Sequence, residues 1–395
     1  MIVPNPFFVD RGFGVRVYNQ VKGLKKLNHE ILLICYNAGR NINDINVVKI
    51  PNILYYSEEK IGASLLRIYQ DLILFFVSLL YTIKFKPKII HAHLHEGALI
   101  GIFISKIFAI PVLLDAQGSL IKEIQARQEV KSKTIIFILK IIEKFIYQNV
   151  DFVITSSSVL EKIIINEFKI NKKKVKCIPD CVDVQEFDAV GENFLSMKSK
   201  ICEKFQIQQN KHFVIYLGTL QESYGIKYLL EAISYVKRKR KDIHFLICGG
   251  PEFNVKKYKN IASTIGISEL VSFLGKIPYE ETPKILSIAE VAVAPKLEGS
   301  EGNIKLFSYM AAGLPIVCFD TLVNREILKD YGIYAKVADP SSLAEKLVFI
   351  IENEGLRKEL KYKVRQYVKE NFSLDDIIIQ LNEVYLLMIL SGKYK

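Results

Sequence analysis

The stretch VAVAPKLEGSEGNIKLFSYMAAGLPIVCF, residues 291–319, decides the fold class of this chain. Residues 291–295 form an apolar run of the length and composition of a buried parallel strand. Residues 296–303 contain two glycines and two glutamates, so they predict a loop rather than a strand. A second apolar run, 314–319, completes a predicted strand–loop–helix–strand unit.

A short helix is predicted between these two strands, over residues 304–312. Asn303 is a suitable N-cap, and Gly313 with Pro315 is the usual chemistry of a helix end. A polar loop between a parallel strand and a helix is where doubly wound sheets bind anions. The stretch therefore predicts either a phosphate-binding turn or an ordinary βαβ connection.

Length and composition indicate a globular protein of two domains. The chain has 395 residues, of which 50% are hydrophobic and 24% charged. Its net charge of +12 favours anionic partners such as phosphates, nucleotides, an acidic membrane surface or nucleic acid. Solvated lysines on the surface would give the same net charge, so a run of basic residues in the sequence identifies no partner by itself.

Cysteine usage and the N-terminus predict a cytoplasmic protein. The six cysteines include no CxxC pair, which fits a reducing compartment. A turn predicted at Pro4-Asn5-Pro6 follows Met1 directly, and no signal peptide is indicated. Two apolar segments, 72–83 and 134–147, are shorter than the roughly 20 residues of a membrane span, so they predict buried or interfacial helices.

The first half of the chain begins with a glycine-rich βα unit. Residues 1–3 look like the end of a strand whose start is missing, and Gly12 and Gly14 predict a turn before a helix over 15–26. Val17 stands where a dinucleotide fingerprint would have its third glycine, which argues against bound NAD. The turn would still let a ligand approach the backbone.

A histidine cluster ends the strand predicted over residues 88–92. His91, His93 and His95 alternate, so an extended segment would place their rings on one face. Zinc ligation is one interpretation, but hydrogen-bonding histidines facing a ligand crevice are favoured because no further ligand lies beside them in sequence. The next strand, 111–114, also ends in polar residues, which include Asp115 and Gln117.

The second half repeats the same alternation of strands and helices. A new βα series begins with a strand over 213–217, and each later strand again ends in glycine or polar residues. Two doubly wound parallel sheets with a cleft between them are therefore predicted. Helices predicted over 343–353, 354–371 and 373–390 complete the chain.

An ordered set of motifs resembles the family 4 glycosyltransferases of the GT-B fold. In the second half the set contains YLGTLQESYGIKYLLEAI, ICGGPE, VSFLGKIP and APKLEGSEGNIKLFSYMAAGLPIV, and in the first half GFG, IHAHLHEG, DAQGS and IPDCVDVQEF. The motifs extend over nearly the whole chain in the family's order. That order makes the resemblance far more specific than any one motif.

The resemblance implies an α/β GT-B protein with two Rossmann-like domains facing across a cleft. Residues 1–186 would be the acceptor-side domain, residues 187–372 the nucleotide-sugar-binding domain, and residues 373–395 a helix crossing back to the first domain. It further implies a retaining transferase that moves a sugar from a nucleotide-sugar donor to an acceptor hydroxyl. No cofactor and no metal are expected.

The donor site departs from the family's usual residues at several positions. Thr219 and Tyr224 stand where the resemblance implies an arginine and a lysine that bind the donor diphosphate, and Lys305 is the best local substitute. Glu301 lies within one residue of the position of the glutamate that contacts the sugar, with Glu298 as an alternative. Ser308 replaces the glutamate that contacts the ribose.

These arguments assign two sets of residues. The predicted catalytic residues are His93, Asp115 and Glu301, with His95 and Gln117 beside them on the acceptor side. The predicted donor-binding residues are Gly12, Gly14, Gly218, Thr219, Tyr224, Gly225, Gly250, Glu301, Gly302, Asn303, Lys305 and Ser308.

Two alternatives and several partners follow from the same residues. A GT-B sugar-nucleotide 2-epimerase shares the architecture, and a donor-binding relative with weakened catalysis would fit the missing cations. The acceptor is a carbohydrate or a lipid-linked molecule. The charge and the apolar helices are compatible with peripheral contact with the inner membrane face, although packing of these helices in the core is favoured. Nucleic acid is disfavoured because the basic residues are not interleaved with aromatic residues at motif spacing.

Overall fold

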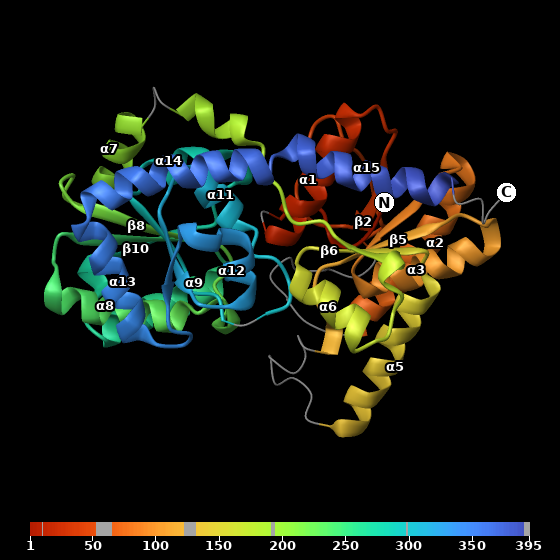
Figure 1. Cartoon of the computed structure of the whole chain (residues 1–395), viewed down its shortest axis with the longest axis horizontal. Helices are drawn as coiled ribbons and strands as arrows, with labels where there is room; N and C mark the ends of the chain where they lie inside the picture. Colours follow the sequence, from red (N-terminus) through yellow and green to blue (C-terminus); the bar gives the residue numbers. More distant parts are fainter. Residues whose placement is uncertain (10, 53–64, 122–131, 191–193, 298, 391–395) are drawn as a thin grey trace. The chain divides into compact units, whose positions relative to one another are not determined.

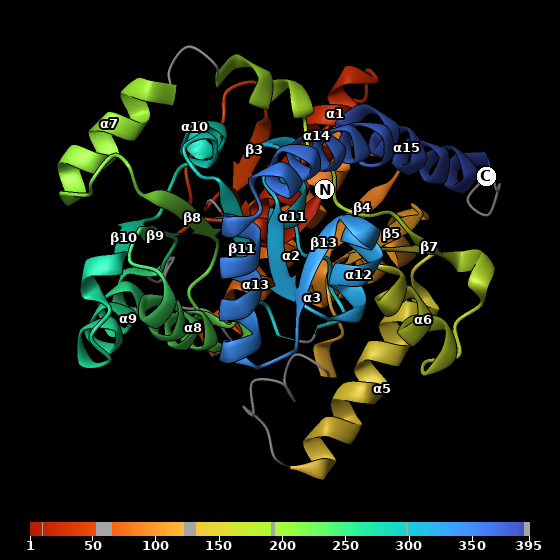
Figure 2. The same cartoon turned by 60° about the vertical axis from the view of Figure 1, so that its left-hand side comes forward.

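The chain folds into two compact α/β units (Figures 1 and 2). The computed structural model describes residues 1–9, 11–52, 65–121, 132–190, 194–297 and 299–390. The first unit holds Met1–Pro179, Gly299–Gly302 and Asp375–Lys395, and the second holds Asp180–Glu298 and Asn303–Leu374. The main division thus falls at residue 179 rather than at residue 186, and the last one at 374 rather than at 372.

A parallel sheet of seven strands forms the centre of the first unit (Figure 1). Its strand order is β3-β2-β1-β4-β5-β6-β7, so the order reverses between β1 and β4, where doubly wound sheets bind ligands. The strands are β1 (Ile2–Pro6), β2 (Leu32–Tyr36), β3 (Asn46–Lys49), β4 (Ile90–His93), β5 (Val112–Ala116), β6 (Phe152–Thr155) and β7 (Val175–Cys177).

Two predictions at the start of the chain were wrong. Strand β1 extends through the prolines that predicted a turn, and its pairing with β2 shifts register between Val3 and Pro6. Helix α1 (Gly12–Lys26) begins at Gly12, so Gly12 and Gly14 lie in its first turn and not in a loop. The loop before α1 therefore ends ahead of both glycines, and their role in donor binding stays a prediction.

Helices cover the first sheet, and the last helix of the chain packs among them. The other helices of this unit are α2 (Leu65–Phe85), α3 (Leu94–Phe108), α5 (Lys133–Asn149), α6 (Ser158–Asn166) and α15 (Leu374–Leu390). Helix α15 packs on α1, since a Cβ built on Gly23 would lie 2.2 Å from Cγ1 of Ile378. Tyr385 of α15 also contacts His91 of β4.

The second unit has a parallel sheet of six strands in the order β10-β9-β8-β11-β12-β13. Its strand order reverses between β8 and β11, which makes their carboxyl ends the ligand-binding edge. The strands are β8 (His212–Leu217), β9 (Ile243–Cys248), β10 (Val271–Gly275), β11 (Val291–Ala294), β12 (Ile316–Phe319) and β13 (Gly332–Ala335). The helices are α7 (Phe194–Phe205), α8 (Ile226–Lys239), α9 (Glu252–Thr264), α10 (Thr282–Ser287), α11 (Lys305–Ala311), α12 (Leu322–Leu328), α13 (Pro340–Glu352) and α14 (Glu354–Asn371).

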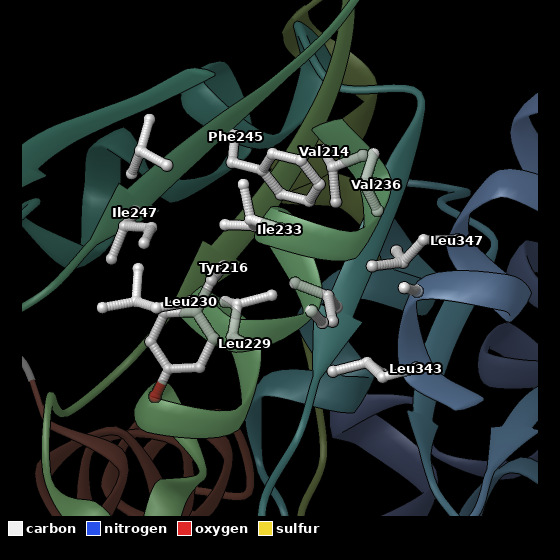
Figure 3. Close-up of a cluster of buried hydrophobic side chains, with 14 of the residues drawn as sticks. Val214, Tyr216, Leu229, Leu230, Ile233, Val236, Phe245, Ile247, Leu343 and Leu347 are labelled. Carbon is white, nitrogen blue, oxygen red and sulfur yellow. The ribbon is translucent and has the colours of Figure 1, made fainter. Parts of the chain in front are cut away.

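Apolar side chains of β8, β9, α8 and α13 form the core of the second unit (Figure 3). Val214 and Phe245 from the sheet meet Ile233 of α8, and Leu347 of α13 lies beside them. Tyr216 of β8 is fully buried at the edge of this cluster, and its hydroxyl donates a hydrogen bond to the carbonyl of Thr219 at 2.7 Å. The core thus holds the carboxyl end of β8 in place. The predicted donor-binding residues of the second unit begin directly after that end.

The deciding stretch has the predicted order, but Asn303 does not cap its helix. Helix α11 begins at Lys305, and the residue before it, Ile304, is helical and makes no side-chain cap. The side-chain amide of Asn303 instead donates to Oδ1 of Asn324 at 3.1 Å. Gly313 ends the helix in the left-handed region (φ +69°), as predicted.

Candidate functional site

The first cluster of predicted site residues lies at the carboxyl ends of β4 and β5. His93 and Asp115 are register partners on these neighbouring strands, and both side chains are completely buried. Nδ1 of His93 lies 3.3 Å from Oδ2 of Asp115. The structure therefore brings together two of the four residues that were predicted on the acceptor side, and the side-chain amide of a third, Gln117, donates to Asp115 at 3.4 Å.

Asp115 is held by residues of α1 that sequence reasoning missed. The Arg16 guanidinium donates to Asp115 through Nε at 2.9 Å and through Nη2 at 2.9 Å, and Gln20 donates to it at 2.9 Å. Burial alone would raise the pKa of Asp115, but the Arg16 charge and the His93 contact hold that pKa well below its usual range. Asp115 is thus a buried anion that positions other groups, and it is poorly suited to accept a proton.

The His93 imidazole is neutral in this setting. Burial lowers the pKa of His93, and its contact with Asp115 only partly offsets that effect. The ring stacks on His91 at 4.4 Å between centroids, and Nδ1 of His91 lies 2.8 Å from the Tyr385 hydroxyl. Neither ring nitrogen of His93 makes a hydrogen bond with the described residues, and Nδ1 faces Asp115, so Nε2 is the nitrogen left for a further partner.

His95 does not join the other two histidines, contrary to the prediction of three rings on one face. Helix α3 begins at Leu94, so the extended segment ends before His95. The His95 ring instead lies 3.5 Å from the Glu143 carboxylate of α5 and 3.2 Å from the Tyr147 hydroxyl. His95 therefore links α3 to α5.

His91, His93 and Asp115 are close enough together to hold a metal ion, with ligand atoms within 4.8 Å of one another. Arg16 is the obstacle to this function. Its guanidinium already donates to both Asp115 oxygens, and a cation at the same carboxylate would meet its positive charge. The hydrogen-bonding interpretation of the histidines fits this geometry better than zinc ligation.

The second cluster of site residues surrounds the carboxyl ends of β8 and β11. Gly218 follows β8 with φ +144°, and its N–H donates to Cys248 of β9. Gly250 accepts a hydrogen bond from the Leu220 N–H, so the β8 and β9 loops are joined through their backbones. A Cβ on Gly218 would lie only 2.7 Å from Nζ of Lys305, so the glycine leaves room for that ammonium.

Gly225 begins α8 at a position that only glycine fits. Its φ is +76°, and a Cβ there would lie 1.7 Å from the Pro295 carbonyl oxygen, which follows β11. We expect Gly225→Ala to lower the free energy of unfolding by about 2–3 kcal/mol. Gly355→Ala is the control, because nothing lies within 4 Å of its Cβ position. Equal thermal melting of the two variants would contradict this account of the β8–α8 turn.

Lys305 is buried, and its ammonium has no hydrogen-bond partner among the residues that the structure describes. The residue is 8% exposed, and its Nζ lies 4.1 Å from the centre of the Tyr216 ring and 5.2 Å from that of Tyr224. Burial, and to a smaller extent the charge of Lys296, lowers the pKa of Lys305 well below its ordinary value. Such a group is poised for an anion, since an anion would stabilise its charged form.

Lys296 is a second cation at the same place, and sequence reasoning missed it. It is 8% exposed, and its Nζ lies 5.8 Å from the Tyr224 ring centre. Tyr224, which stands where the resemblance implies a lysine, is thus contacted by two lysines that follow β11. Both of these lysines follow β11 rather than β8.

The remaining predicted residues are distributed between the two units. Thr219 follows Gly218 and is partly buried, and Ser308 is buried on α11. Glu301 and Gly302 belong to a four-residue segment of the first unit, where the Gly302 N–H donates to Ser156 at 3.0 Å. Glu298 lies outside the described residues. The role of Glu301 stays a prediction.

Comparison with known proteins agrees with the division of the chain into two units. The family model described as glycosyltransferase family 4 matches residues 11–186, and the model described as glycosyl transferases group 1 matches residues 197–367. Together they cover most of the chain, one in each half. The chain belongs to the family 4 glycosyltransferases, and its two Rossmann-like parallel sheets have the GT-B fold.

Two curated relatives and one solved structure illustrate the similarity. An uncharacterized glycosyltransferase of Methanocaldococcus jannaschii is 24% identical over 78% of this chain and 76% of its own. A phosphatidyl-myo-inositol mannosyltransferase of Mycobacterium leprae is 28% identical over 45% of this chain and 47% of its own, so this chain spans about half of that relative. The structure of Anabaena HepE in complex with UDP-glucose matches with a TM-score of 0.78 at 14% identity, covering 97% of this chain and 98% of that one. These matches favour a glycosyltransferase over the epimerase alternative.

Proposed function

We propose that this glycosyltransferase takes its sugar from a nucleotide-sugar donor and transfers it to an acceptor hydroxyl with retention of the anomeric configuration. The observation that carries the donor assignment is Lys305, an unpaired ammonium at the edge where the strand order of the second sheet reverses. The Anabaena structure similar in fold is a complex with UDP-glucose, which supports the same ligand class.

In this proposal Lys305 and Lys296 bind the donor diphosphate in place of the cations missing at Thr219 and Tyr224. The diphosphate is also the leaving group, and a cation already fixed in a buried place stabilises the charge that develops on it. Gly218, Gly225 and Gly250 let the donor approach the backbone of the β8 and β9 loops, while Ser308 faces the donor from α11.

On the acceptor side, we assign different roles to the two predicted catalytic groups. His93 accepts a hydrogen bond from the acceptor hydroxyl through Nε2, and Asp115 with Arg16 fixes the orientation of the imidazole. Glu301 is proposed to orient the sugar. Retention requires the acceptor on the face that the diphosphate leaves, so positioning and electrostatics supply most of the catalysis. The reaction as proposed uses no metal.

The acceptor class we propose is a lipid-linked molecule met at the cytoplasmic face of a membrane. The Mycobacterium leprae relative is named for a lipid acceptor, phosphatidyl-myo-inositol, and the first unit of this chain exposes apolar helices with lysines between them. A soluble carbohydrate is the alternative acceptor, and product analysis separates the two.

A thermal-shift panel of nucleotide sugars tests the donor assignment. A specific donor at 100 times its Kd stabilises the folded protein by about 2.7 kcal/mol, while the free sugar does not. If no nucleotide and no nucleotide sugar shifts the melting temperature, the donor assignment is wrong. If a donor binds but its nucleotide is never released, the chain is the catalytically weakened relative.

A further inference from the structure

Helix α5 turns its apolar side chains outward. Only Glu143, Ile146 and Tyr147 of this 17-residue helix are buried. In Figure 1 the helix extends away from the sheet of its own unit. Its exposed large apolar residues are Ile135, Phe137, Ile138, Ile141, Ile142 and Phe145, and Phe137 is 64% exposed. A contiguous patch of this kind marks an interaction surface.

Helices α2 and α3 extend the same surface. Phe75 of α2 packs on Phe103 of α3 at 6.4 Å between ring centres, and Lys106 of α3 lies over the Phe145 ring of α5 at 6.0 Å. On α2 the exposed apolar residues recur every three or four positions and so form one stripe: Ile68, Leu72, Phe76, Leu80 and Ile83. The three helices together are called the apolar helix surface below.

Helix α2 lies along the first unit through its opposite side. By length and composition alone, Leu66–Phe85 is long and apolar enough to cross a membrane. However, Leu74 and Ser78 are fully buried, and Asp71 accepts a hydrogen bond from Tyr36 of β2 at 2.5 Å. These contacts hold α2 against the sheet and leave only its outer stripe for a partner.

The charges of the apolar helix surface indicate what kind of partner this surface binds. Lys84, Lys106, Lys140 and Lys144 are exposed among the apolar residues. The acids of the three helices are engaged within the unit: Asp71 with Tyr36, Glu96 with Arg67, and Glu143 with His95. Apolar side chains surrounded by lysines match the interface of a bilayer that contains anionic lipids.

We propose that the apolar helix surface docks the protein on an anionic lipid bilayer, with α5 inserted into the headgroup region. The inference deepens the proposed function and rests on it in one respect, because a lipid-linked acceptor presents its hydroxyl at such a surface. Glu143 of α5 contacts His95 of α3, which lies two residues beyond His93, so the docking helix is tied to the segment that follows β4.

Vesicle flotation tests the proposal directly. Full-length protein is mixed with vesicles of phosphatidylcholine alone or with 30% phosphatidylglycerol, at about 0.1 M and 0.5 M salt. We expect flotation with the anionic vesicles at low salt. The double variant Phe137→Asp, Ile141→Asp should lower the partition coefficient at least about tenfold, and Lys140→Gln with Lys144→Gln should lower it by about tenfold at low salt only.

Phe253→Asp is the matched control, since Phe253 is an exposed apolar residue (56%) of the second unit. It should float like the wild type. The proposal is overturned if the wild type stays with the lipid-free fraction, or if the Asp variants float equally well. It is also overturned if light scattering shows a dimer that the Asp variants dissociate, because the surface would then bind a second copy. Donor-induced thermal shifts of the same variants should stay normal, so loss of docking is distinguishable from failure of the donor assignment.

Discussion

Replacing Lys305 by methionine should lower the affinity for a nucleoside diphosphate about 100-fold and lower turnover of the sugar donor at least as much. The substitution removes a charge-assisted contact between a buried, preorganised cation and the diphosphate. Such a contact is worth about 2–3 kcal/mol. Methionine keeps the length and the apolar contacts of the lysine stem with Tyr216. Calorimetry with the nucleoside diphosphate and, separately, with the nucleoside measures the affinity, and only the diphosphate should be affected.

The same substitution should stabilise the ligand-free protein by about 1–3 kcal/mol, because it removes a buried polar group without a partner. The direction in which this stability difference changes with pH can also be predicted. Since the pKa of Lys305 is lowered by folding, the lysine destabilises the folded state at all pH values below its unfolded pKa of about 10.4. The stability gain of the variant should therefore shrink as the pH rises toward that value.

The control for Lys305 is Lys227→Met on the exposed side of α8, where the Lys227 side chain is 67% exposed. It should change neither affinity nor stability measurably. A Lys305→Met protein that binds the diphosphate as tightly as the wild type would remove the main support for the donor site. Weaker binding together with lower stability would indicate a structural role instead.

The second large effect is expected at the buried ion pair of the first unit. Asp115→Asn should lower the free energy of unfolding by about 3–5 kcal/mol, because it leaves the Arg16 guanidinium buried opposite a neutral group. For a unit of this size the loss corresponds to a fall of roughly 10 °C in the melting temperature. Circular dichroism during heating measures it, and the unit that contains Asp115 should melt first.

The pH dependence and a double variant separate the ion pair from simple repacking. The folded pKa of Asp115 is depressed, so its contribution is present above the unfolded carboxyl pKa of about 3.9 and is lost as the pH falls through the lower, folded pKa. The difference between the wild type and Asp115→Asn should therefore shrink in acid. Combining Arg16→Met with Asp115→Leu should recover much of the loss.

Glu383→Gln is the control for the ion pair, because Glu383 and Lys176 form an exposed pair in the same unit. Its effect should stay below about 1 kcal/mol. If Asp115→Asn melts like Glu383→Gln, then the Arg16–Asp115 pair does not stabilise the acceptor-side cluster. The proposed positioning of His93 would then lose its basis.

The sequence predicted the architecture because local signals agree with the global fold. Apolar strands ended by polar residues, alternating with helices, indicate parallel sheets, and both observed sheets are parallel. Local signals failed where tertiary contacts override them. The prolines of β1 predicted a turn, Asn303 predicted a cap, and His95 seemed part of a strand. In each case a distant partner or a neighbouring strand determined the conformation.

Prediction from the sequence was limited in the same way at the candidate site. Arg16 and Asp115 are far apart in the sequence, and nothing at Arg16 indicates a buried partner before α1 is packed on the sheet. Lys296 is the first residue of the predicted loop but was not assigned a role, because its relation to Tyr224 depends on how the β11 loop passes the β8 loop. Lys305 was predicted from the missing cations, and its burial between two tyrosines adds the physical reason for an anion site.

The central claim, transfer of a sugar from a nucleotide sugar with retention, is tested most directly by following turnover by NMR spectroscopy. The protein is incubated with each of a panel of nucleotide sugars, with and without an anionic lipid extract as the source of acceptor. We expect release of the nucleoside diphosphate from one donor class, an acceptor-dependent glycoside with the anomeric configuration of the donor, and loss of both in Lys305→Met. A glycoside of inverted configuration, or no nucleotide release from any donor by the wild-type protein, would contradict the account.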